Sequence, residues 1–229
     1  MTVRMAAAAA AALLLAACTG DRPSAPAAPA PPSEIVVMPA RPAYICPNGR
    51  LMEIAEDQAA GTLRILTGST ESIALAAAGR PATYVAGEIT IAVAPEALAV
   101  TGGTTAAMSC PRRPQGPTPG VLWGTLDKAD RMAIPEGSRA RVVLAEVSRM
   151  DAPAVEIAAT TITTVGNQVP LHFLLRYDPA RIEAGRTYAV SVRLTLPDGS
   201  LRYVTDTLNR VLAEGPAAPL ELRLVPARP

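Results

Sequence analysis

The chain has few aromatic residues and no cluster of basic ones. Aromatic side chains make up 3% of the 229 residues, so any core must be built from valine, leucine, isoleucine and alanine. Lysine and arginine total 21 against 20 aspartates and glutamates, and no run of positive charge occurs. Nucleic-acid binding requires clustered positive charge. We therefore expect no nucleic-acid partner.

Catalytic and metal-binding motifs are also missing. The sequence contains no glycine-rich phosphate loop, no Gly-x-Ser-x-Gly elbow and no Cys-x-x-Cys pair. His172 is the only histidine, and we interpret it as an exposed strand residue rather than a catalytic one. Asp127 and Asp130 have nothing beside them that would separate their pKa values, so we interpret them as solvated turn residues. These features predict a protein that is not an enzyme, with no metal, cofactor or small-molecule substrate.

The N-terminus carries the most informative pattern in the chain. Arg4 precedes the apolar run Met5–Ala17, which ends in Leu13-Leu-Leu-Ala-Ala-Cys18. The run is too short to cross about 30 Å of hydrocarbon as a helix. It resembles the lipobox of bacterial lipoprotein signal peptides, although an ordinary secretory signal followed by a chance cysteine is an alternative. The resemblance implies cleavage before Cys18, acylation of that residue, and anchoring of the protein in a membrane.

The three cysteines fit this interpretation. If Cys18 carries lipid, Cys46 and Cys110 remain as a pair. Export places them in an oxidising compartment, where a disulfide between them would persist. Two unpaired buried thiols are the alternative.

Proline-rich segments divide the remaining chain. Pro23–Pro32 consists of proline and alanine with one serine and is typical of an extended tether, and Pro111–Pro119 is typical of a break between domains. We predict five segments: a signal peptide (1–17), the lipidated cysteine and tether (18–40), a first β domain (41–110), a linker (111–118) and a second β domain (119–226).

Both domains are predicted to be all-β. Glycines separate short apolar segments in the first, which predicts six to eight strands in a small barrel. Alanine disfavours strands, so Ile73–Ala78 and Pro95–Ala99 are alternatively single helical turns. The second contains seven candidate strands, and Thr187–Leu196 alternates apolar with more polar residues. Pro197-Asp-Gly199 follows as a turn. We expect a seven-stranded immunoglobulin-like sandwich with Trp123, the sole tryptophan, packed in its core.

The second domain resembles the YscW/YbaY-like lipoproteins, which are grouped with type III secretion lipoprotein chaperones. Matching segments run in order through this half: VLWGTL at 121–126, AIPEGS at 133–138, QVPLHF at 168–173, YDPARI at 177–182 and PDGSL at 197–201. The resemblance implies a lipid-anchored β-sandwich without enzymatic activity. Secretion-linked members act as pilots that bind an outer-membrane ring component.

The first domain resembles membrane-bound inhibitors of c-type lysozyme. Tyr44-Ile-Cys-Pro-Asn-Gly49 matches the opening of that family, and Cys110 matches its closing cysteine. By this resemblance, Ala78, Gly79, Tyr84 and Glu96 are candidate partner-contact residues. The family's serine is replaced by Ala78, and the domain has no lysine.

We therefore expect a lipid-anchored envelope protein that works by contact with another envelope protein. The alternatives are an inhibitor or sensor of a wall-cleaving enzyme, and an envelope hydrolase. Thr19 follows Cys18, and by resemblance to known sorting rules this residue favours the outer membrane, with the domains in the periplasm.

Overall fold

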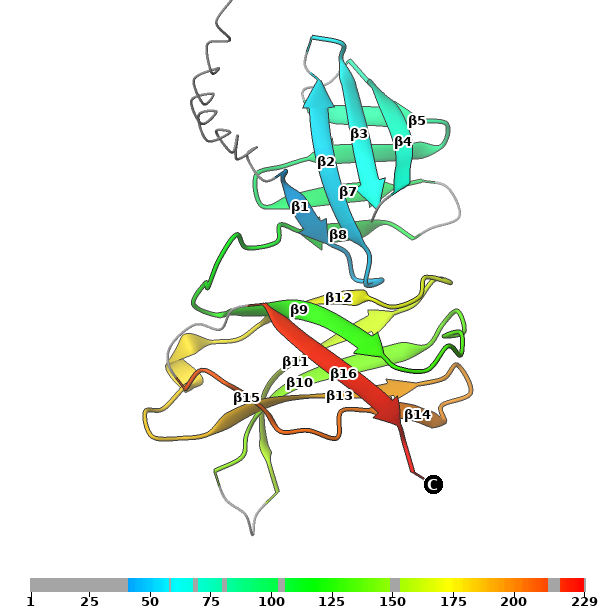
Figure 1. Cartoon of the computed structure of the whole chain (residues 1–229). Coiled ribbons are helices and arrows are strands. Elements are labelled where there is room, and N and C mark those ends of the chain that lie inside the picture. Colours follow the sequence, from blue (N-terminus) through cyan, green and yellow to red (C-terminus); the bar gives the residue numbers. More distant parts are fainter. Residues whose placement is uncertain are drawn as a thin grey trace, which may run out of the picture. The chain divides into compact units, whose positions relative to one another are not determined.

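The structure is a computed structural model. It describes residues 41–228 except 58, 68–69, 80–81, 103–105, 149–152 and 214–218. The predicted signal peptide, Cys18 and the proline-rich tether lie outside the described residues. Residues Ala40–Pro229 belong to one compact unit. All of its described long elements are strands, as the sequence predicted, and they form two eight-stranded sheets (Figure 1). No helix in the described segments is long and apolar enough to cross a membrane.

The N-terminal sheet is an up-and-down arrangement in which every strand pairs with its neighbour in sequence. All of these pairs are antiparallel. Its strands are β1 (Ala43–Ile45), β2 (Leu51–Asp57), β3 (Thr62–Thr67), β4 (Thr70–Ala77), β5 (Thr83–Ala86), β6 (Ile89–Val93), β7 (Ala97–Thr101) and β8 (Met108–Pro111).

This sheet closes on itself after β8. Arg112 forms a bridge to Tyr44, and the backbone N–H of Arg113 donates to the carbonyl of Ala43 at 2.7 Å. The first residues of the segment predicted as a linker therefore continue the N-terminal sheet. The barrel encloses a small core of Tyr44, Cys46, Ile54, Leu63, Ile65, Tyr84, Ile91, Leu98 and Cys110. The helical alternative for Ile73–Ala78 and Pro95–Ala99 is wrong, because β4 and β7 are strands.

The C-terminal sheet has a more complicated strand order, β11-β10-β13-β14-β16-β9-β12, with β15 also paired to β13. Its elements are β9 (Val121–Lys128), β10 (Arg139–Glu146), β11 (Val155–Thr163), β12 (Leu171–Arg176), the 3-10 helix η1 (Pro179–Arg181), β13 (Tyr188–Thr195), β14 (Leu201–Val204), β15 (Asn209–Val211) and β16 (Leu220–Pro226). The short strand β15 was not predicted.

The C-terminal sheet folds into two layers, and the pairing of β14 with β16 joins them. β16 runs parallel to β9, whereas the other pairs are antiparallel (Figure 1). The predicted alternation in β13 is confirmed: Val190, Val192 and Leu194 are buried and Ser191 and Arg193 are exposed.

The turn predicted after β13 is also confirmed. Gly199 has φ +84°, and the N–H of Leu196 donates to the carbonyl of Ser200 at 2.9 Å. Glycine accepts this left-handed backbone without steric cost. The turn thus reverses the chain between β13 and β14.

The core of the C-terminal sheet contains twice as many buried residues in the described chain as the N-terminal core. Its members are Leu122, Leu126, Ile134, Ala140, Val142, Leu144, Ile162, Leu171, Phe173, Leu175, Tyr188, Val190, Val192, Leu194, Tyr203, Val211, Leu222 and Leu224. Trp123 is not among them. It points away from the side of β9 that buries Leu122 and Leu126, so the prediction of a core tryptophan is wrong.

Candidate functional site

A shallow cleft lies at the end of the C-terminal sheet where β10 ends and β11 and β13 begin. Its volume is about 270 Å³, and it is lined by Glu146, Val155, Ile157, Arg181, Glu183, Arg186 and Tyr188. Val155 leaves 53% of its surface exposed. The half-buried side chain of Ile157 packs against the C-terminal core. The cleft thus has an apolar side that continues into the protein interior.

Two arginines and two glutamates give the cleft mixed charge. Arg186 pairs with Glu183 at 3.3 Å and with Glu146 at 3.8 Å. These side chains are partly exposed, so the pairs contribute little to stability and remain available for other partners. Alternating charges beside an apolar patch are suited to binding a polypeptide segment.

Arg181 fixes the shape of the cleft. It lies in η1, where Asp178 caps the first turn by accepting from the N–H of Ala180. Its guanidinium donates to the carbonyls of Ile157 and Glu156, which lie on β11. Tyr188 supports the same loop, because its hydroxyl accepts from the N–H of Glu183 at 2.8 Å. The two basic residues therefore have different environments: Arg181 donates to backbone carbonyls, whereas Arg186 pairs with the carboxylates of Glu183 and Glu146.

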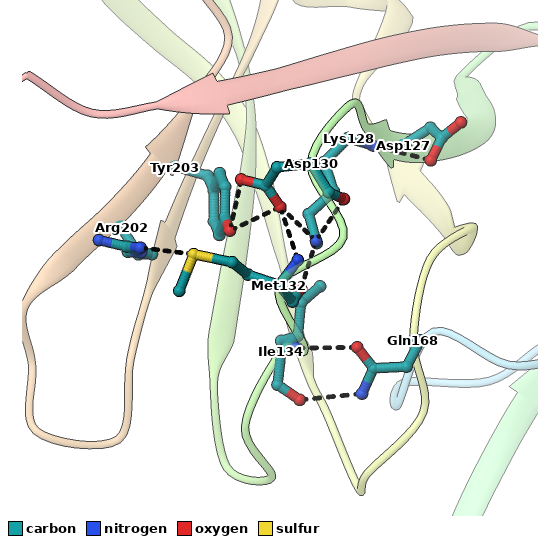
Figure 2. A network of polar contacts seen from close by, with 8 residues as sticks. All are labelled: Asp127, Lys128, Asp130, Met132, Ile134, Gln168, Arg202 and Tyr203. Carbon is teal, nitrogen blue, oxygen red and sulfur yellow. Dashed lines mark hydrogen bonds and ion pairs between the residues drawn. The ribbon is translucent and has the colours of Figure 1, made fainter.

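A second polar cluster lies at the opposite end of β10, around the loop that follows β9 (Figure 2). The side chain of Lys128 is only 2% exposed, yet its ammonium group has three partners. It donates to Asp130 Oδ1 at 2.6 Å, to the carbonyl of Asp130 at 3.0 Å and to the carbonyl of Met132. The three donors of this buried charge are therefore all used, as its desolvation requires.

Asp130 is the centre of this cluster. Besides Lys128, it accepts from the Tyr203 hydroxyl at 2.9 Å and from the N–H of Met132. The hydrogen bond from Lys128 lowers the pKa of Asp130, with Tyr203 contributing in the same direction. Burial and the bond to Asp130 raise the pKa of Tyr203.

These bonds give the loop a structural role. Gln168 adds to it by accepting from the N–H of Ile134 at 2.7 Å and donating to its carbonyl at 3.1 Å. Asp130 was predicted to be a solvated turn residue, and this prediction is wrong because the carboxylate is bound on several sides. Asp127 does lie exposed, and it accepts from the N–H of Lys128.

The cysteines predicted to pair are joined in the structure. Cys46 and Cys110 form a disulfide and are both buried in the N-terminal core. Cys46 directly follows β1, and Cys110 lies in β8.

The four candidate contact residues of the N-terminal sheet do not form one surface loop. Ala78 and Gly79 are exposed between β4 and β5, and Glu96 is exposed between β6 and β7. Tyr84 is only 7% exposed, and its hydroxyl donates to Glu56 at 2.9 Å. Burial and this bond raise the pKa of Tyr84. Tyr84 is therefore a core residue, contrary to the prediction of a loop contact.

His172 also differs from its prediction as an exposed residue. It is half-buried on β12, and burial lowers its pKa, with Arg113 acting in the same direction and Glu53 opposing. Arg113 also stacks on the ring of Trp123, 5.4 Å from its centroid. The outer side of β9 and β12 is thus covered by charged residues from the N-terminal half.

Sequence reasoning missed the cleft altogether. Its two arginines, Arg181 and Arg186, lie within the segment 178–186, which begins with an Asp-Pro turn and has Gly185 between the arginines. Such a charged turn is ordinary in sequence, and only the fold brings it beside Val155.

Comparisons with known proteins concern the C-terminal half. Residues 119–224 match the family described as "Type III secretion system lipoprotein chaperone (YscW)". The chain is 30% identical over 105 residues to "Uncharacterized lipoprotein YbaY" of Escherichia coli (strain K12), covering 46% of this chain and 54% of that protein. It therefore spans about half the length of this curated relative.

A solved structure is also similar. It is titled "Structure of an alternative pilotin from the type II secretion system of Vibrio cholerae", with 37% identity and a TM-score of 0.43, and the match covers 47% of this chain and 97% of that one. The resemblance of residues 41–110 to lysozyme inhibitors stays a prediction, because the family match begins at residue 119.

Proposed function

We propose that this protein is a lipid-anchored envelope lipoprotein that binds a segment of another envelope protein, in the manner of a chaperone or pilot. The observation that carries the proposal is the match of residues 119–224 to a family described as lipoprotein chaperones. Such a protein acts by contact rather than by chemistry. The anchor is Cys18, and Thr19 after it favours the outer membrane with both sheets in the periplasm.

The cleft beside Val155 is the part of the C-terminal sheet that best fits this role. An exposed aliphatic side chain beside a half-buried one offers an apolar contact, and Arg186 with Glu146 and Glu183 offers polar contacts of both signs. Interfaces of this kind join an apolar centre to a polar rim. A short polypeptide segment of mixed charge suits these groups.

The anchor is tested by replacing Cys18 with serine in the full chain. The unchanged chain should incorporate fatty acid and fractionate with the outer membrane, whereas C18S should show neither property. Intact-mass analysis of membrane extracts measures the acyl increment directly. An unchanged chain without an acyl increment would overturn the anchor.

The cleft is tested by placing a photo-crosslinking residue at Val155 in intact cells. Met132 provides a matched control, because it is 54% exposed and lies in the loop before β10, away from the cleft. We expect one discrete adduct with an envelope protein from position 155, none from position 132, and loss of the adduct in Arg186→Glu. Equal labelling from both positions would contradict the cleft as the binding site.

A further inference from the structure

The C-terminal sheet has two free edges that lie beside each other. β11 pairs only with β10, and β12 pairs only with β9, so within the described chain no ladder joins β11 to β12. The two strands are nevertheless neighbours in space. A strand edge of this kind carries unpaired backbone groups that can accept another polypeptide.

A turn of the N-terminal half already occupies one end of this gap. Three consecutive carbonyls of Pro47–Gly49 each accept a hydrogen bond from the C-terminal half. Pro47 accepts from the N–H of Thr163 on β11 at 3.3 Å, and Gly49 accepts from the N–H of His172 on β12 at 2.8 Å. Between them, Asn48 accepts from the side-chain amide of Asn167 at 2.9 Å.

The fit of this turn depends on glycine at its third position. Gly49 has φ +81°, and a Cβ there would lie 2.9 Å from Ile162 Cγ2 and 3.3 Å from the side chain of Leu171. Ile162 and Leu171 belong to the C-terminal core and lie on the two edge strands. The turn backbone therefore packs directly on the apolar groups between β11 and β12.

The turn is also held by hydrogen bonds and a disulfide within the N-terminal half. Gly49 N–H donates to the carbonyl of Cys46, Cys46 N–H donates to the carbonyl of Arg50, and Asn48 Oδ1 accepts from Arg50 N–H. The disulfide from Cys46 to Cys110 ties its base to the N-terminal core. A preformed ligand of this kind loses little conformational freedom on binding.

We infer that the adjacent ends of β11 and β12 form a docking site for the backbone of a polypeptide segment, and that the turn Pro47–Gly49 is its intramolecular occupant. The segment must present successive carbonyls to Thr163, Asn167 and His172, with a glycine at the last of them. The N-terminal sheet then masks this edge until the turn moves away. The inference deepens the proposed function, since it names a second contact site for a polypeptide partner.

The test uses Gly49→Ala in the full chain, with Gly87→Ala as the matched control. Gly87 also has a positive φ, of +56°, but a Cβ there would meet nothing within 4 Å. Both variants carry backbone strain, and only the first displaces the turn. We expect the amides of Thr163 and His172 to exchange with solvent about tenfold faster in G49A and at the original rate in G87A. Unchanged exchange in G49A would show that the turn is not an occupant.

Docking itself is tested by adding a synthetic peptide with the sequence of residues 45–51, with serine in place of Cys46, to G49A. The peptide should slow exchange at both amides about threefold or more in G49A and have no effect on the unchanged chain. No slowing in G49A would overturn the docking site. Slowing that depends on protein concentration without peptide would overturn it in favour of self-association.

Asn167→Asp tests the same contact between the turn and the C-terminal sheet if G49A does not fold. Asn167→Asp preserves the oxygen that accepts from Val165 N–H at 3.0 Å but removes the donor to Asn48. It should likewise speed exchange at Thr163 and His172, and an unchanged rate would contradict the inference. These readouts need no envelope partner and no lipid, so their failure is distinguishable from failure of the crosslinking or acylation tests.

Discussion

The two sheets of this protein have the same number of strands but are stabilised in different ways. The N-terminal sheet pairs strands in sequence order, closes on itself through Arg113 and Ala43, and contains the Cys46–Cys110 disulfide. The C-terminal sheet combines distant segments and includes a parallel pair, and within the described residues its end strands β11 and β12 each pair with one strand only. It has no cysteine, but among the described side chains its core is larger.

This difference accounts for the roles that we infer for the two halves: the C-terminal sheet supplies the docking site, and the N-terminal half supplies the turn that occupies it. The bridge from Arg112 to Tyr44 closes the N-terminal sheet between β8 and β1, so the backbone groups of that edge are engaged within the sheet. The C-terminal sheet keeps such donors between β11 and β12, where Thr163 and His172 bind the turn of the other sheet. The N-terminal sheet, with its disulfide, thus supplies a turn that is held in place, and the C-terminal sheet supplies the strand edge that binds it.

The largest expected effect comes from removing the Cys46–Cys110 disulfide of the N-terminal sheet. Replacing Cys46 and Cys110 with serine should lower the free energy of unfolding of this sheet by about 4 kcal/mol, because the disulfide closes a long loop in the unfolded chain. Hydrogen exchange resolved by segment during a denaturant titration measures the effect. The control is the C-terminal sheet in the same sample, whose strands β10 and β13 should be affected much less. Equal losses in both sheets would break the comparison.

A glycine in the C-terminal sheet gives the next largest effect. A Cβ on Gly124 in β9 would lie 1.9 Å from the carbonyl oxygen of Leu220, where β16 approaches in parallel. Gly124→Ala should therefore destabilise the C-terminal sheet by about 3 kcal/mol, since the backbone must shift. Urea unfolding measures the change. Gly116→Ala is the control, because a Cβ there meets nothing within 4 Å. Equal stability of the two variants would show that β9 and β16 need no close approach.

Local sequence patterns predicted the elements of the molecule better than its contacts. Alternation in Thr187–Leu196 and the turn at Pro197–Gly199 identified β13 and the hairpin after it, because both depend on residues close in sequence. The alanine-rich segments now seen as β4 and β7 were ambiguous, since alanine disfavours strands and only pairing with neighbours decides the matter. β15 was missed because three residues carry too little pattern.

The candidate sites depend on contacts that a single sequence does not reveal. Arg181 lies in a common Asp-Pro turn, and only the fold brings it to the carbonyls of β11. Gly49 was noticed as part of a family motif, whereas its packing against Ile162 depends on a distant strand. Trp123 and His172 lie on a strand face that is covered by the N-terminal half, so rules for isolated sheets misplace them.

A matched pair of tyrosines compares the two sheets at smaller energies. Tyr84 donates to Glu56 in the N-terminal sheet, and Tyr203 donates to Asp130 in the C-terminal sheet, both at 2.9 Å. Tyr84→Phe and Tyr203→Phe should each lower the free energy of unfolding by about 1 to 2 kcal/mol, as expected for a hydrogen bond to a carboxylate. Segment-resolved exchange should locate each loss in its own sheet. A loss from Y203F that extends to both sheets would mean that the loop around Lys128 supports the whole unit.

The smallest effect tests the covered face of β12 by its dependence on pH. Burial lowers the pKa of His172 from its ordinary value of 6.5, and Arg113 adds to this against Glu53. The unfolded chain therefore binds a proton at a higher pH than the folded chain, so stability falls as pH decreases from about 6.5 through the lowered pKa.

His172→Gln retains the backbone N–H that binds Gly49 but has no such titration. Thermal unfolding between pH 7 and pH 5 should show a decreasing midpoint in the unchanged chain and a flatter one in H172Q. Asp130, whose pKa is lowered from 3.8, contributes only at lower pH, so this window isolates the histidine. An equal slope in both proteins would mean that His172 is as accessible to water in the folded chain as in the unfolded one, and that the N-terminal half does not cover β12.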